Sequence, residues 1–130
     1  MKTFTFRYDP RPFKSAMESI ERTIKTGIAS IDDDSIACKS MEDMMKVMTK
    51  ARFRVFATIV EKAPESMTEL ARILKKDLGN VLRDATVLES IGLIKLQKSP
   101  GIRGEKVKPV ALYQRIIFEC APKKEAKIAG

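Results

Sequence analysis

The side chains best suited to bind another molecule lie on one predicted helix, residues 77–91. Its apolar residues recur at helical spacing and predict the face that turns inward: Val81, Ala85, Leu88 and Ile91. The opposite face carries Gly79, Asn80, Arg83 and Thr86. In the major groove of DNA, asparagine pairs with an adenine edge, and arginine pairs with a guanine edge or a phosphate. We therefore predict base contacts by Asn80 and Arg83, with Gly79 allowing the backbone to approach DNA closely.

Two features of this helix admit a second interpretation. Arg83 is also placed for a salt bridge with a nearby carboxylate, Asp84 or Glu89. Leu82 and Val87 make the outer face less polar than base recognition usually requires. They either touch thymine methyl groups, or they pack against another part of the chain or against a partner.

Basic side chains lie on both sides of this helix. Lys75 and Lys76 form the turn before it and suit phosphate contact. Residues 95–130 hold nine of the 25 Lys and Arg side chains and three of the 17 Asp and Glu side chains, so most of the net charge of +8 lies there. One short segment with Pro100, Gly101 and Gly104 predicts a basic hairpin that contacts phosphates through Lys98, Arg103 and Lys106. A solvated surface loop is the alternative interpretation.

Turn and cap residues predict the elements that position these side chains. Ser66 and Glu69 form a capping box at the start of a short helix, and Asp77 caps the next helix. Gly92 suits the left-handed position that ends that helix. Strand composition follows at residues 93–96, 107–112 and 115–118, with a turn at residues 99–105. This order predicts an α+β fold, a winged helix-turn-helix with a three-helix core and a β-wing.

Residues 66–96 resemble the helix-turn-helix and first wing strand of MarR-like winged-helix regulators. The matching pieces are the capped helix TELARIL, the spacing to NVLRDATVLES and the closing IGLIKL. Flanking segments extend the resemblance over most of residues 1–119, to a small prokaryotic family of winged-helix regulators often found beside toxin or restriction–modification genes. The resemblance implies a sequence-specific regulator of transcription that binds double-stranded DNA, often an antitoxin-type autorepressor.

The remaining segments predict a three-part organisation. Residues 1–39 predict a strand–helix–strand module for dimer or partner contact, because KTFTFRY alternates and residues 35–39 form a short strand able to pair with it. Residues 40–120 are the predicted winged helix-turn-helix. Residues 121–130 predict a basic, flexible tail.

Composition argues against catalysis and cofactors. The chain has no histidine, which excludes Ser-His-Asp, Cys-His and histidine–metal sites. Two cysteines cannot close a zinc site, and no phosphate-binding glycine motif occurs. We therefore predict a protein that is no enzyme and that uses no metal or cofactor. We also predict that Cys38 and Cys120 have no redox role.

Three kinds of partner follow from these patterns. Double-stranded DNA suits the predicted helix and wing, and a homodimer would pair two half-sites. A toxin or another protein partner suits the methionines of residues 41–48 and the acidic run Asp32–Asp34, so the alternative function is a protein-binding antitoxin or adaptor.

No apolar run reaches the roughly 18 residues of a membrane helix, and the cysteine usage predicts the reducing cytoplasm.

Overall fold

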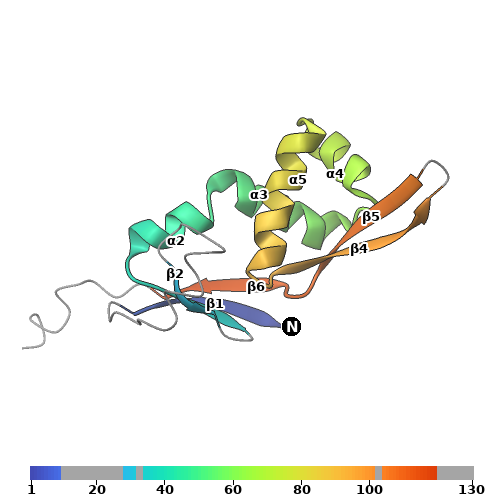
Figure 1. The fold of residues 1–130 in the computed structure, drawn as a ribbon. Helices are drawn as coiled ribbons and strands as arrows, with labels where there is room; N and C mark the ends of the chain where they lie inside the picture. The colour runs from blue at the N-terminus through green and yellow to red at the C-terminus, as the bar shows by residue number, and fades with distance from the viewer. Residues whose placement is uncertain (10–27, 32–33, 102–103, 120–130) are drawn as a thin grey trace, which may run out of the picture. The chain divides into compact units, whose positions relative to one another are not determined.

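The computed structural model describes residues 1–9, 28–31, 34–101 and 104–119, which form a mixed α+β fold (Figure 1). The chain divides into two compact units. One unit comprises Met1–Lys2 and Met48–Gln114, and the other comprises Thr3–Val47 and the residues from Arg115 onward. The helix of the predicted strand–helix–strand module, the residues Asp32 and Asp33, and the predicted tail lie outside the described residues.

A four-stranded sheet forms the unit that contains the N-terminal strand. Its strand order is β2 (Ile28–Ile31), β3 (Ser35–Cys38), β1 (Thr3–Tyr8) and β6 (Arg115–Phe118). β1 runs parallel to both β3 and β6, and β2 runs antiparallel to β3. The predicted pairing of the first strand with residues 35–39 is confirmed, because Thr5 pairs with Ser35 and Tyr8 with Cys38.

Aromatic packing explains why β1 occupies an inner position of this sheet. The alternation of KTFTFRY places Phe4 and Phe6 on one face, and both side chains are fully buried. The Phe6 ring stacks on Phe118 of β6 with a centroid distance of 5.0 Å. Beside the sheet strands, α2 (Met41–Val47) begins at Ser40, whose hydroxyl accepts a hydrogen bond from the Asp43 N–H.

Three helices and a hairpin form the other unit. The helices are α3 (Lys50–Lys62), α4 (Met67–Leu74) and α5 (Leu78–Ser90). The hairpin consists of β4 (Ile94–Gly101) and β5 (Gly104–Ala111), which pair antiparallel and extend away from the helices (Figure 1). The core of this unit is apolar and includes Val55, Ile59, Leu70, Val81, Ala85, Leu88 and Leu93.

The structure draws two boundaries differently from the sequence analysis. α2 and β6 belong to the unit with the N-terminal sheet, whereas the predicted boundaries placed residues 40–120 together. The strands of the hairpin also run further than predicted, because they form a continuous ladder from Ile94–Ala111 to Gly101–Gly104. The predicted turn at residues 99–105 is therefore mostly strand.

Candidate nucleic-acid interface

The turn between α4 and α5 holds Lys75 and Lys76 at the surface. Lys75 ends α4 in the left-handed conformation, with φ +57°. Its N–H donates to the Arg72 carbonyl, and the N–H of Lys76 donates to the Ala71 carbonyl. Both lysine side chains are exposed. The turn therefore presents two positive charges immediately before α5.

Side-chain caps fix where the two helices begin. The Ser66 hydroxyl accepts from the Glu69 N–H at 3.1 Å, and the Glu69 carboxylate accepts from the Glu65 N–H at 3.2 Å. The Asp77 carboxylate accepts from the Asn80 N–H at 3.2 Å. These bonds confirm Ser66 and Asp77 as the predicted caps. The glutamate bond reaches one residue further than in the usual capping box.

Gly79 leaves room for the Asp77 cap. A Cβ atom added at Gly79 would lie 3.0 Å from a carboxylate oxygen of Asp77. The absence of a side chain at Gly79 therefore gives the Asp77 carboxylate room to cap α5, in addition to the predicted close approach of the backbone to DNA.

The outer face of α5 carries the four residues that the sequence predicts for it. Its inner face buries Val81, Ala85 and Leu88. The exposed residues of the first two and a half turns include Gly79, Asn80, Arg83 and Thr86. These four positions therefore face solvent in the unit that contains them.

Asn80 and Arg83 are bonded to each other. The Arg83 guanidinium donates to the Asn80 Oδ1 over 2.8 Å. This bond uses the oxygen with which an asparagine would accept from adenine. Thr86 donates its hydroxyl proton to the Leu82 carbonyl over 2.8 Å, so its oxygen is available as an acceptor.

The carboxylates considered as partners of Arg83 are engaged elsewhere. Asp84 forms a salt bridge with Arg52 of α3, with an Nε–Oδ1 distance of 3.3 Å. Glu89 accepts from the Leu96 N–H over 2.9 Å. The described contact of Arg83 is therefore with an amide and leaves its positive charge without a neutralising bond from either acid.

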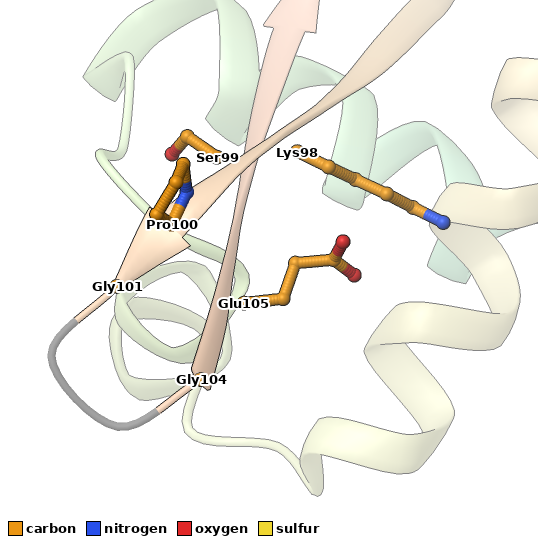
Figure 2. Close-up of a pocket in the computed structure, with 6 residues that line it drawn as sticks. All are labelled: Lys98, Ser99, Pro100, Gly101, Gly104 and Glu105. Atoms are coloured by element: carbon orange, nitrogen blue, oxygen red, sulfur yellow. The ribbon is translucent and has the colours of Figure 1, made fainter.

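The hairpin places its lysines on two different faces. Residues directly opposite each other in an antiparallel pair share a face, and successive residues alternate. The pair Lys98–Val107 shares its face with Pro100–Glu105, and Figure 2 shows Lys98 and Glu105 extending to the same side. The pair Ser99–Lys106 lies on the other face. The structure thus separates Lys98 from Lys106, and Arg103 lies outside the described residues.

One face of the hairpin is basic along its length. The register places Lys95, Gln97 and Ser99 of β4 on the same face as Lys106 and Lys108 of β5. Lys95 and Lys106 are exposed, and Lys108 forms a 3.6 Å ion pair with Glu65. We define this basic face by Lys95, Lys106 and Lys108. Lys95 and Lys108 were not among the predicted contacts, although the two-residue period of a strand groups Lys108 with Lys106 and the register adds Lys95.

Two hollows lie beside the hairpin. The smaller one, of about 420 Å³, is lined by residues near the hairpin tip, among them Lys98, Pro100 and Glu105 (Figure 2). A larger hollow of about 780 Å³ extends from the tip to the start of α4 and to Leu78 and Leu82 of α5. The leucines keep 43% and 40% of their surface exposed. Leu82 therefore borders the hairpin without being covered by it.

Cys38 is poorly suited to redox chemistry or metal binding. Burial raises the pKa of its thiol to about 12, and the Asp43 carboxylate adds to the shift while Arg7 opposes it. The thiol is therefore protonated at neutral pH and is a weak nucleophile. Among the described residues, no group of His, Cys, Asp and Glu side chains is arranged to hold a metal ion. Cys120 lies outside them.

None of the helices in the described part of the chain has the length and apolar character required to cross a bilayer.

Comparison with known proteins places the chain in a family. Curated proteins give no match to the sequence. The family model described as HVO_A0114 matches residues 47–118, which is more than half of the chain. That segment includes α3, α4, α5, the hairpin and β6. The chain therefore belongs to the HVO_A0114 family.

Proposed function

We propose that residues 48–114 are a winged helix-turn-helix that binds double-stranded DNA and regulates transcription. In this proposal α4 and α5 are the helix-turn-helix, α5 enters the major groove, and the β4–β5 hairpin is the wing. The order of three helices followed by an antiparallel hairpin supports it.

The observation that carries the proposal is the exposed polar row on α5 beside a basic hairpin. Arg83 projects from the outer face of α5 with its guanidinium held by Asn80. A guanidinium donates two parallel hydrogen bonds to guanine, the commonest specific contact in the major groove. Lys95 and Lys106 share the hairpin face that lacks carboxylates within its ladder. The unit thus carries side chains suited to base recognition on α5 and side chains suited to charge neutralisation on the hairpin.

Phosphate contacts in this proposal come from the turn and the hairpin. Lys75 and Lys76 precede α5, and Lys95 and Lys106 lie on the basic face of the hairpin. Lys98 and Arg103 complete the proposed set. Lys75 occupies a left-handed conformation that costs a residue with a side chain about 1 kcal/mol and that glycine adopts readily. A lysine at this strained position supports a role for its charge.

The proposal is tested with variants that remove either a base contact or a phosphate contact, because the two kinds of contact affect specific and random DNA binding differently. A binding site is selected from random duplexes with the wild-type protein, and affinities for that site and for random DNA are then compared. Arg83→Ala should reduce the ratio of specific to random affinity, at a cost of about 1–3 kcal/mol on the selected site. Lys106→Ala should weaken both affinities alike. The opposite pattern, with the ratio lost only in Lys106→Ala, would assign sequence recognition to the hairpin instead.

A second candidate function rests on α2. Met41 and Met45 expose 37% and 47% of their surface, whereas Met44 is buried. Flexible methionines on a surface suit a protein partner, so we propose as the alternative an antitoxin or adaptor that occupies a partner enzyme. In that case the wild-type protein would bind no duplex DNA even at low salt. Its binding to the product of a neighbouring gene would be weakened by Met41→Gln with Met45→Gln.

A further inference from the structure

Two exposed leucines form a continuous stripe on the α5 flank next to the hairpin. Leu78 and Leu82 lie four residues apart and therefore one above the other on the same side of the helix. A single exposed leucine is ordinary, but here both leucines line the larger hollow together with Pro100 and Val107 of the hairpin, and the largely buried Met67 also lines it. The two leucines therefore belong to an apolar part of the surface of this unit.

The stripe lies next to the exposed polar row of α5. With 3.6 residues per turn, Gly79 and Arg83 follow Leu78 and Leu82 as the neighbouring row on the helix surface. A molecule that accepts hydrogen bonds from Arg83 and also extends across the neighbouring row contacts Leu82 as well. That molecule must present polar acceptors and an apolar group side by side.

The charges around the hollow disfavour a phosphate in contact with the leucines. Among the described residues that line it, Glu105 is acidic and Lys106 is basic, so these residues together add no net charge. A phosphate pressed against the leucine side chains would lose hydration without gaining a bond. In the major groove of unmodified DNA, the apolar group beside polar base edges is the C5-methyl group of thymine.

We propose that Leu78 and Leu82 recognise thymine methyl groups in base pairs next to the one contacted by Arg83. This inference rests on the proposed entry of α5 into the major groove. It assigns specificity to two apolar residues that neither donate nor accept hydrogen bonds, and it predicts A·T pairs beside the guanine in the recognised site.

The experiment removes one methyl group at a time from the DNA. A site is selected from random duplexes with the wild-type protein, and each thymine is replaced singly by deoxyuridine, which keeps the base pair. Affinities are measured by fluorescence anisotropy. One or two replacements should weaken wild-type binding about fourfold, the value expected for exposing one buried methyl group. A replacement at the thymine that Leu82 contacts should not change the affinity of the Leu82→Ala variant. A replacement at the thymine that Leu78 contacts should likewise not change the affinity of the Leu78→Ala variant.

Phe53→Ala is the matched control, because Phe53 of α3 is 46% exposed and does not line the hollow. This variant should retain the wild-type sensitivity to deoxyuridine. The inference is overturned if every replacement leaves wild-type affinity within twofold while the site is still bound selectively, or if the sensitivity persists in both leucine variants. The first of these results would leave the proposed function intact. Absence of any duplex binding would overturn both.

Discussion

The hydrogen bond between Asn80 and Arg83 couples two side chains that the sequence suggested as separate base readers. The 2.8 Å bond occupies the Asn80 oxygen and restricts the rotation of the guanidinium. Holding Arg83 in one orientation reduces the side-chain entropy that it loses on binding a base. In the proposed interface, Asn80 would therefore act as a positioning residue for Arg83.

A double-mutant cycle tests this coupling. Asn80→Ala and Arg83→Ala should each weaken binding to the selected site, and the double variant should be little worse than Arg83→Ala alone. The coupling energy should exceed about 0.5 kcal/mol, as found for residues in direct contact. If the two losses of binding free energy are additive, and if the loss in Asn80→Ala disappears when one particular adenine is replaced, then Asn80 reads that base independently of Arg83.

Cys38 should make stability depend on pH in the alkaline range. The unfolded thiol releases its proton near the ordinary value of 9.0, whereas the folded thiol keeps it up to about 12. Because the folded state then binds more protons, the free energy of unfolding falls as the pH rises through this window, by at most about 1.4 kcal/mol per pH unit.

Urea unfolding below pH 9 and between pH 9 and 12 measures this effect, with Cys38→Ala as the comparison. Each protein is compared with itself at the two pH values, so the packing cost of the substitution cancels. The wild-type protein should lose more stability than the variant. Equal losses would show that the thiol pKa is not raised in the folded protein.

At the scale of elements, local signals in the sequence predict the boundaries of the helices well. Ser66 and Asp77 accept the hydrogen bonds predicted for helix caps, and Ser40 and Thr49 accept equivalent bonds at the starts of α2 and α3. Gly92 has the positive φ expected after α5. These features depend on residues within one turn of each other, which is why sequence alone specifies them.

Contacts between distant parts of the chain were not predictable in the same way. β6 was recognised as a strand, but its pairing with β1 joins residues more than 110 positions apart. Its composition does not reveal its partner, because Arg115–Phe118 lacks a turn-linked neighbour that would fix the register. The separation of Lys98 from Lys106 depends on the hairpin register, which the predicted turn at residues 99–105 left open.

The α4–α5 turn allows stability and DNA binding to be separated. Lys75→Gly should raise the free energy of unfolding by about 0.5–1 kcal/mol, because glycine adopts the left-handed conformation without strain. Lys76→Gly is the control: Lys76 does not have a positive φ, so glycine there should lower stability. Both variants should lose a similar amount of affinity for random DNA. Chemical denaturation that found Lys75→Gly less stable than the wild type would contradict the role assigned to the strain.

At the scale of the whole molecule, we expect two copies of the chain to act together. One α5 and one hairpin contact only a few base pairs, and paired half-sites lie about 10 base pairs apart in such regulators. Light scattering at micromolar concentration should therefore give about twice the chain mass of 14.6 kDa. Met41→Gln with Met45→Gln should reduce the dimer fraction if the exposed face of α2 contributes to the interface. A mass of one chain for the wild-type protein would contradict the prediction.

A salt titration of the wild-type protein on random-sequence duplex DNA tests the central claim most directly. Each lysine that neutralises a phosphate contributes about 0.9 to the slope of log affinity against log salt. With Lys75, Lys76 and Lys106 in contact, we predict a linear fall with a slope of about −2.7 or steeper per chain bound. Lys106→Ala should make the slope shallower by about 0.9, the contribution of one phosphate contact. An absence of duplex binding at low salt, or an affinity that does not change with salt, would contradict the proposal that this surface binds DNA.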